Sequence, residues 1–381
     1  MLGCLRRPMR TSPLVDIDAY RCRAAQMSRF LGSPEAKPRD MLRVPVSTYP
    51  LRKPRLTRIA EREIRELTGL ERPPDIRCLH VTIDAGMQRT LDEMCRAASA
   101  ESNVQAVAAT FIRTGTSEVV AESNFVGGQE AESSAAFLGT IQPGSTYKPF
   151  VLLEALEQGL DAHTELPSAP FVWRSGSFAN GAWNVRSFDH VYRGEINLER
   201  ALVLSDNTVF ARLVQLLGTD HVLRRLAQFG LVGEDESNPS VALGSTRTGI
   251  SLIALSRAYA CLSQRGVMAD PYIVRGIEFE DGSLLPRVRK RALVTNASIA
   301  SLNVLDRILL QSGIARKNIR GKTGTSASGS LFAGYDDALS YAVWIGFRSA
   351  RSEWWSKGLR AKGFLERTLD RMAGRSPLFI G

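Results

Sequence analysis

Three short groups of polar residues in this 381-residue chain have the types and spacing needed for acyl transfer. The first is Ser145-Thr-Tyr-Lys148, in which residues three apart would share one face of a helix. A serine hydroxyl attacks a carbonyl efficiently only after a base removes its proton. A lysine can be that base only if desolvation or neighbouring cations keep its amine neutral. The spacing therefore makes Ser145 a candidate nucleophile and Lys148 its candidate base, although an S-x-x-K is expected about once by chance in a chain of this length.

The second group is Ser205-Asp206-Asn207, at a break between two apolar helical stretches. A hydroxyl at Ser205 can pass a proton between Lys148 and a leaving amine, and the Asn207 amide can orient Lys148 or hold a substrate carbonyl. Ser, Asp and Asn are also the preferred residues at the start of a helix, so the tripeptide alone equally fits an ordinary N-cap.

The third group, Lys322-Thr323-Gly324-Thr325, is the most specific, because this tetrapeptide is expected by chance in well under about one such chain in a hundred. We predict that it lies on a strand. Lys322 would present a cation to a terminal carboxylate, with Thr323 beside it, and Gly324 would leave the strand edge open to a peptide. The backbone N–H groups of Thr325 and Ser145 form a candidate pair of oxyanion donors.

Two predicted hairpins far apart in the chain would position these groups. Residues 104–113 and 117–125 alternate like strands around a turn at 114–115, and residues 334–347 form a similar pattern around a turn at 336–337. About two hundred residues of mainly helical pattern separate them. We expect an α/β (α+β) fold, with one antiparallel sheet built from both ends of the sequence, flanking helices and an inserted all-helical lobe.

The N-terminal part differs in composition from the rest. Residues 1–75 carry 16 Lys and Arg against 9 Asp and Glu, which is most of the net charge of +10, and they contain frequent prolines. We interpret residues 1–78 as a basic arm or linker with short helical patterns such as 57–70, and residues 79–375 as the folded domain, beginning with a strand and a helix joined through Asp84. Without a nucleic-acid motif or interleaved aromatic residues, no nucleic-acid partner is expected.

The five cysteines and four histidines do not suggest a metal site. The cysteines are odd in number, widely scattered and without a C-x-x-C pair, and the histidines are isolated. The spacing therefore indicates neither a disulfide scaffold nor a zinc site, and we expect no metal and no cofactor.

Longer stretches around the three groups resemble the transpeptidase domain of penicillin-binding proteins, of the class A, bifunctional peptidoglycan synthase type. The resemblance covers about residues 79–347 and is carried by TIDAGMQRTLD, QPGSTYKPF, YRGEINLERALVLSDNTVFARL and GKTGTS. It implies that Ser145 displaces the terminal D-Ala of a peptidoglycan stem peptide ending in D-Ala-D-Ala, giving an acyl-enzyme that an amine of a second stem peptide then attacks. It also implies that β-lactam antibiotics acylate the same serine.

The chain departs from that family in two respects. Neither a glycosyltransferase domain nor a membrane anchor or signal peptide is recognisable, so we expect no glycan polymerisation, and residues 12–70 resemble at most the tail of such a domain. The family implies action in the periplasm, at the outer face of the cytoplasmic membrane. The basic arm would suit a membrane surface or a separate glycan polymerase as a further partner.

Several alternatives share the same three groups. A serine β-lactamase would need a glutamate for deacylation, and Glu234 with Asn238 loosely imitates the required loop, although a surface loop explains that spacing better. A D,D-carboxypeptidase would differ only in using water as the acceptor. A non-catalytic β-lactam-binding scaffold or a degenerate copy is the alternative from a different functional class.

Overall fold

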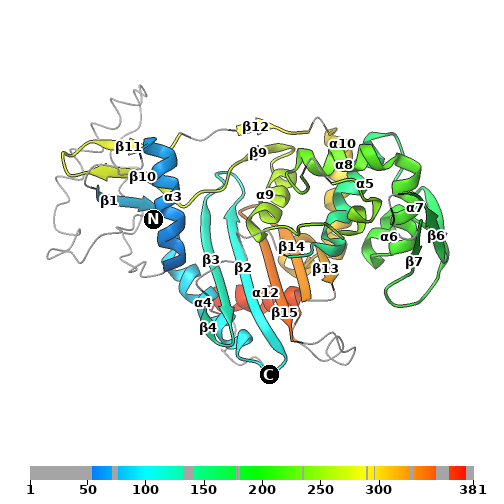
Figure 1. Ribbon diagram of the computed structural model, residues 1–381, viewed down its shortest axis with the longest axis horizontal. Coiled ribbons are helices and arrows are strands. Elements are labelled where there is room, and N and C mark those ends of the chain that lie inside the picture. Colours follow the sequence, from blue (N-terminus) through cyan, green and yellow to red (C-terminus); the bar gives the residue numbers. More distant parts are fainter. Residues whose placement is uncertain are drawn as a thin grey trace.

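A six-stranded antiparallel sheet forms the centre of the molecule (Figure 1). The computed structural model describes residues 54–70, 76–131, 141–176, 178, 181–233, 236–288, 291–295, 297–326, 329–348 and 360–374. The strand order is β13-β14-β15-β2-β3-β4. Their bounds are β2 Val104–Arg113, β3 Val119–Val126, β4 Gln129–Glu130, β13 Arg320–Ser326, β14 Gly329–Tyr335 and β15 Leu339–Phe347. Both predicted hairpins are confirmed, and β15 pairs with β2 to join the two ends of the sequence.

The two faces of this sheet bury different layers because side chains alternate along each strand. Leu331 and Ala333 of β14 contribute to the core shared with the helical lobe. Phe332, between them, faces the opposite side, in the core shared with α4 (Ala85–Ser99) and α12 (Ala361–Met372). Helix α4 begins where the sequence predicted, because the Asp84 carboxylate accepts a hydrogen bond from the Met87 N–H at 3.0 Å.

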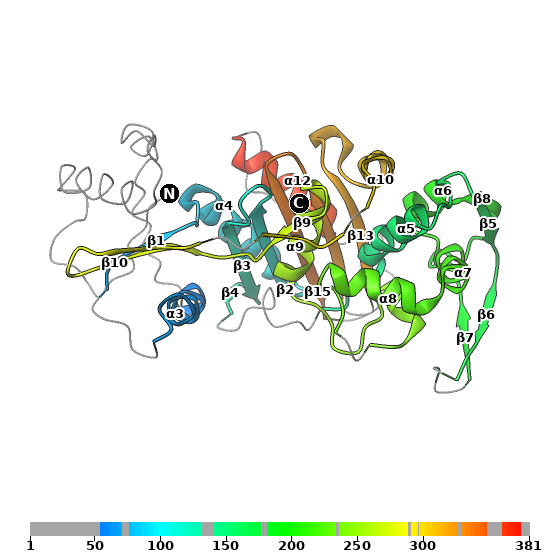
Figure 2. The ribbon, with the colours of Figure 1, turned by 90° about the horizontal axis from the view of Figure 1, so that it is seen from above.

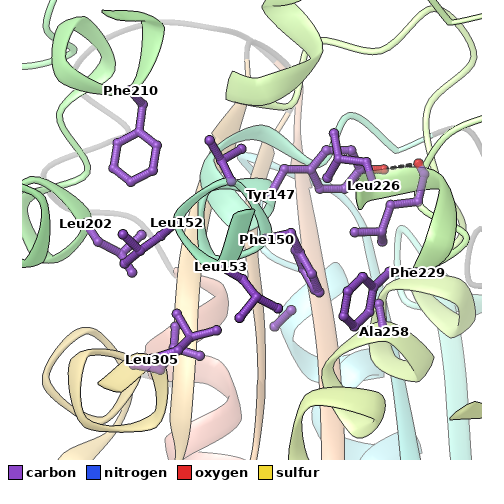
Figure 3. Packing of buried hydrophobic residues seen from close by; sticks show 14 of the residues in the cluster. Tyr147, Phe150, Leu152, Leu153, Leu202, Phe210, Leu226, Phe229, Ala258 and Leu305 are labelled. Atoms are coloured by element: carbon purple, nitrogen blue, oxygen red, sulfur yellow. Dashed lines mark hydrogen bonds between the residues drawn. The ribbon is translucent and has the colours of Figure 1, made fainter. Parts of the chain in front are cut away.

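The inserted lobe is mainly helical and packs around α5. Its helices are α5 Lys148–Glu157, α6 Leu198–Leu204, α7 Asn207–Leu217, α8 Thr219–Gln228, α9 Leu252–Ser263 and α10 Ile299–Ser312, with 3-10 turns η1 Gly144–Tyr147, η2 Pro239–Leu243 and η3 Ala315–Lys317. Figure 3 shows Phe150 of α5 directed towards Phe229, and the ring of Tyr259 also packs on it, with centroids 4.8 and 5.5 Å away. Aromatic contacts of this kind fix α5, and with it the first motif, against its neighbours.

Short two-stranded ribbons accompany these helices. These ribbons were not predicted from the sequence. They are β5 Glu165–Ser168 with β8 Gly194–Asn197, β6 Phe171–Arg174 with β7 Ala182–Val185, and β9 Val267–Ala269 with β12 Arg291–Leu293. Figure 2 shows β5 to β8 at one end of the molecule, beyond α6 and α7. Each strand is only three or four residues long, which is too short for a strong alternating pattern.

A small unit lies at the other end of the molecule (Figures 1 and 2). It contains α3 Pro54–Thr68 and a sheet of β1 Ile76–Val81, β10 Val274–Phe279 and β11 Leu284–Pro286. The apolar face of α3 packs on this sheet, with Leu56 and Ile277 in one core cluster. We expected ordered packing to start near Leu79. It begins earlier, at α3, because the apolar face of α3 packs against β10. The division into an arm of residues 1–78 and a domain of residues 79–375 stays a prediction.

One carboxylate joins α3 to β10. Glu63 is buried and accepts hydrogen bonds from the Ile273 N–H at 3.0 Å and the Val274 N–H at 2.9 Å. The guanidinium of Arg287 donates to the same carboxylate at 2.9 Å. Burial raises the pKa of Glu63, and these donors and the Arg287 charge oppose that rise.

No helix in the described part of the chain combines the length and the apolar composition needed to cross a bilayer.

Candidate functional site

Ser145 lies in the η1 turn that leads into α5, as the sequence predicted, and this turn contacts β13. Gly144, directly before it, has a left-handed φ of +54°, and a Cβ atom placed there would lie 2.8 Å from the carbonyl oxygen and 3.1 Å from the nitrogen of Thr325. The Gly144 N–H donates to the carbonyl of Gly244 at 3.1 Å. The two N–H groups predicted as oxyanion donors, on Ser145 and Thr325, are thus carried by segments in backbone contact.

Gly324 has a packing role that the sequence did not indicate. A Cβ atom there would lie 2.5 Å from the carbonyl oxygen of Pro143 and 3.0 Å from a methyl carbon of Thr146. The glycine therefore lets the turn carrying Ser145 approach the strand. Strand β13 is also at the edge of the sheet, where the sequence argument required a peptide-docking strand.

Two side-chain contacts hold the segment that contains the η1 turn. The hydroxyl of Tyr259, buried on α9, donates to the carbonyl of Thr146 at 2.8 Å. The Gln142 amide makes a paired contact with the backbone of Thr246, donating to its carbonyl and accepting from its N–H, both at 2.9 Å. The lobe therefore fixes this turn through both contacts, in addition to its backbone contact with β13.

The amine of Lys148 is fully buried and hydrogen-bonded to the second motif. Its Nζ atom donates to the Asn207 Oδ1 atom at 2.7 Å and to the Ser205 carbonyl at 2.7 Å, with the Ser205 hydroxyl 3.4 Å away. Ser205 adopts a left-handed φ of 59°, which directs its carbonyl and hydroxyl to the same amine. A non-glycine residue adopts this conformation at some energetic cost, and such strain is commonest at functional sites.

The electrostatic surroundings favour the neutral form of Lys148. Burial, and secondarily the charge of Lys322, lower the pKa of Lys148 well below its ordinary value, while the Asp206 carboxylate opposes this shift. The Lys322 amine is also buried, lying 3.2 Å from the Thr323 carbonyl. Burial, with a smaller contribution from Lys362 of α12, lowers its pKa to about 7.

Asp206, in the middle of the second motif, caps α7. Its Oδ1 atom accepts hydrogen bonds from the N–H groups of Thr208 at 2.8 Å and Val209 at 3.1 Å. Its Oδ2 atom accepts from the Ser168 hydroxyl at 2.5 Å. The N-cap interpretation of this tripeptide therefore holds for Asp206, and the cap leaves Ser205 and Asn207 on either side to contact Lys148.

Of the predicted site residues, Lys148, Ser205 and Asn207 are in direct contact. Lys322 is close enough to affect the pKa of Lys148, and Ser145 and Thr325 lie on segments in contact through Gly144. The sequence analysis missed Gly244, Tyr259 and Lys362, which support this arrangement. Nothing in their local sequence pattern indicates it, because each acts across a tertiary contact.

The deacylating glutamate considered for a β-lactamase, Glu234, lies outside the described residues. Asn238, its suggested partner, accepts a hydrogen bond from the Ser240 N–H at 2.9 Å and caps η2. That contact is the ordinary role of an asparagine before a helical turn.

The potential metal ligands Cys78, His80 and Glu278 lie on β1 and β10, with their ligand atoms within 4.8 Å of one another. However, Cys78 is disulfide-bonded, a bond that the cysteine spacing did not predict. A disulfide sulfur is not the thiolate that binds a metal, and Glu278 pairs with Arg77 at 3.3 Å. This cluster in the described region therefore does not form a metal site in its oxidised state.

Fold and sequence together assign the class of protein. The family described as "Penicillin binding protein transpeptidase domain" matches residues 107–355, so the chain belongs to this family. Penicillin-binding protein 1A of Neisseria flavescens is 29% identical over an alignment of 229 residues, which covers 55% of this chain and 28% of that protein. Penicillin-binding protein 2D of Bacillus subtilis is 25% identical over 382 residues, covering 91% of this chain and 54% of the relative. The chain thus spans about half or less of the length of these relatives.

Solved structures show the same fold. The PonA1 protein of Mycobacterium tuberculosis in complex with penicillin V superimposes with a TM-score of 0.67 at 20% identity, covering 84% of this chain and 91% of that one. Penicillin-binding protein 1A of Haemophilus influenzae gives a TM-score of 0.60 at 20% identity, and the match covers 71% of this chain and 48% of that one. The expected fold class, an antiparallel sheet with flanking helices and an inserted helical lobe, is confirmed.

Proposed function

We propose that this protein is a D,D-transpeptidase that cross-links peptidoglycan stem peptides through an acyl-enzyme on Ser145. The observation that carries the proposal is the buried Lys148 amine, hydrogen-bonded to Ser205 and Asn207. Burial lowers its pKa, so a larger share of this amine is neutral at ordinary pH than for an exposed lysine. A neutral amine close to a serine is what general-base activation of that serine requires.

In the first step, Lys148 takes the proton of Ser145 while Oγ attacks the carbonyl of the penultimate D-Ala. The N–H groups of Ser145 and Thr325 donate to the oxyanion of the tetrahedral intermediate. The C–N bond then breaks, Ser205 relays the proton to the leaving amine, and D-Ala departs. The Lys322 charge and the exposed Thr325 side chain, with Thr323, would hold the terminal carboxylate.

In the second step, the amine of another stem peptide attacks the ester carbonyl and its proton passes back through Ser205 and Lys148. The new amide forms as the bond from the carbonyl carbon to Ser145 Oγ breaks. A β-lactam would enter the first step in the same way, leaving a stable ester. The substrate lies outside the cytoplasmic membrane, so we propose that the protein acts there.

The test is covalent labelling with a fluorescent penicillin. We expect stoichiometric labelling of the protein, complete loss with Ser145→Ala, and normal labelling with Ser283→Ala, a matched change in the turn between β10 and β11. Persistence of the label for many minutes supports a transpeptidase, whereas release within seconds indicates a β-lactamase. Absence of any label on folded protein would overturn the proposal in favour of a non-catalytic role.

Product analysis separates the remaining alternative. A D-Ala-D-Ala stem peptide would be incubated with and without an amine acceptor. Formation of a cross-linked dimer supports transpeptidation, whereas release of D-Ala with hydrolysis alone, even at high acceptor concentration, identifies a carboxypeptidase.

A further inference from the structure

The segment between β7 and β8, residues 186–193, is attached to the second motif at both of its ends. We call it the rim segment. At its start, the Asn207 Nδ2 atom donates to the carbonyl of Arg186 at 3.2 Å. At its end, the N–H of Arg193 donates at 3.2 Å to the hydroxyl of Ser168, which itself donates to the Asp206 carboxylate at 2.5 Å. The rim segment is therefore positioned by the same turn that contacts Lys148.

Three large apolar side chains are exposed on this hydrogen-bonded segment. Phe188 is 64% exposed, Val191 49% and Tyr192 38%. The backbone between them is held internally, because the Asp189 carboxylate accepts from the Val191 N–H at 3.1 Å and also pairs with Arg193. Single exposed apolar residues are common, but several gathered on one fixed segment indicate a contact surface.

The hydrogen bonds of Asn207 show which reactant this surface would meet. One end of its amide accepts from Lys148 at 2.7 Å and the other donates to Arg186 at 3.2 Å. A single side chain thus spans from the proposed base to the rim segment. The proposed mechanism assigns the donor carboxylate to β13, whereas the attacking amine must deliver its proton to Lys148. The peptide attached to that amine would leave the site past Asn207.

We propose that the rim segment binds the acceptor stem peptide, with Phe188, Val191 and Tyr192 packing against it during attack on the acyl-enzyme. This proposal rests on the proposed transpeptidase function and assigns its acceptor side. The contact lowers the activation free energy of amine attack relative to that of attack by water, because water makes no contact with the rim segment. The rim segment therefore sets how the acyl-enzyme divides between cross-linking and hydrolysis.

The experiment measures the ratio of cross-linked to hydrolysed product, which is independent of the rate of acylation. The donor is a D-Ala-D-Ala stem peptide. The acceptors are a stem tetrapeptide with a side-chain amine, prepared with lysine and with diaminopimelate, and isotopically labelled D-alanine. D-alanine lacks the peptide that would contact the rim segment, and its label distinguishes its product from the donor. Val191→Ala is compared with Val172→Ala on β6, because both valines are 49% exposed in the same lobe.

We expect Val191→Ala to lower the ratio about fivefold for the stem-peptide acceptor, from the loss of two methyl groups at a contact. The double variant Phe188→Ala/Val191→Ala should lower it at least tenfold. Neither should change the ratio for D-alanine, and Val172→Ala should change neither ratio. Because these side chains are exposed, the variants should fold, which circular dichroism checks.

An unchanged ratio in the Phe188 and Val191 variants, an equal effect of Val172→Ala, or an equal loss with D-alanine would each overturn the assignment of the acceptor to the rim segment. In those cases the wild-type protein still forms cross-links, so the transpeptidase function stands. If the wild-type protein forms no acyl-enzyme, the proposed transpeptidase function itself is wrong. This outcome differs from failure of the rim-segment assignment, in which the wild-type protein still forms cross-links.

Discussion

The contacts of η1 with β13 and η2 and the contact of α3 with β10 all join distant parts of the chain, but by opposite means. At η1, glycines bring backbone against backbone, and a Cβ atom on Gly244 would lie 2.0 Å from the carbonyl oxygen of Gly144. At α3, the buried Glu63 carboxylate and its donors bridge the two elements. The comparison indicates that where backbone N–H groups must be placed for a reaction, close steric packing fixes them, whereas a supporting element can be held by one polar side chain.

The largest expected effect is that of Gly244→Ala. The new methyl group would overlap Gly144 at a residue with φ of +77°, so we predict a loss of about 3–4 kcal/mol in the free energy of unfolding and a penicillin acylation rate reduced at least about 100-fold. Gly282→Ala is the control, because its φ is +82° and no atom lies within 4 Å of the added methyl group. It should cost about 1 kcal/mol from backbone strain and acylate normally. Equal behaviour of the two variants would show that steric contact at η1 is unimportant.

Glu63→Gln should affect stability without affecting the site. The amide keeps one acceptor oxygen but loses the charge that pairs with Arg287, so we predict a loss of about 2 kcal/mol in the free energy of unfolding. Penicillin acylation should stay within about twofold of wild type, because Glu63 contacts no element of the site. Urea unfolding and hydrogen exchange of α3 measure the first, and labelling kinetics the second. A loss of acylation in Glu63→Gln would mean that the α3–β10 contact affects the η1 contact, and it would contradict a purely supporting role for α3.

Tyr259→Phe removes one hydroxyl from the support of η1 and keeps the ring packed on Phe150. The Thr146 carbonyl would lose its 2.8 Å hydrogen bond. We therefore predict an acylation rate about fivefold lower and a loss of about 1 kcal/mol in the free energy of unfolding. Tyr272→Phe is the matched control, because Tyr272 is also buried but lies just before β10, with its hydroxyl directed to Glu118, and it should leave acylation unchanged. Acylation at the wild-type rate in Tyr259→Phe would show that glycine packing alone fixes the turn.

The smallest expected effect tests whether charge also matters near β13. Lys322 has a pKa of about 7, so its cation is largely present below that pH and is lost as the pH rises through it. If the cation holds the substrate carboxylate, kcat/KM for acylation falls on the alkaline side with an apparent pKa of about 7. Lys362→Met removes a repelling charge, so this alkaline limb should move to higher pH and the rate at pH 8 should rise roughly threefold.

Lys317→Met is the control for that experiment. Lys317 pairs with Asp370 of α12 at 2.6 Å, and the variant makes the same change of charge near the same helix. Its pH profile should match that of the wild-type protein. A profile in Lys362→Met that does not move would show that the Lys322 cation does not limit acylation.

The sequence predicted those features that depend on local pattern. The two hairpins, the strand at Lys322 and the helix starts near Ser145 and Asp206 follow from alternation, turn residues and capping residues, and they are confirmed. The short ribbons were missed because strands of three or four residues carry little periodicity. The packing of α3 was also missed, because its partner β10 lies some two hundred residues away and contributes the other half of the contact.

The candidate site divides in the same way. The residue types and order of the three motifs identified the side chains that could react. The support given by Gly244 and Tyr259 depends on tertiary contacts with Gly144 and Thr146, and neither contact has a local sequence signal. The assignment of catalytic roles to the motif residues stays a prediction that the labelling experiments test.

The pairing of β15 with β2 has a consequence for how the protein is made. Arg113 pairs with Leu339, so the central ladder of the sheet cannot close until the C-terminal strands have left the ribosome. Such non-local pairing slows folding, because the conformational entropy of a long loop is lost before the contacts between its ends form. The nascent chain therefore carries Ser145 without the strand that faces it until residues 320–326 have been made, and reactivity with an acyl donor would arise only at the final stage of folding.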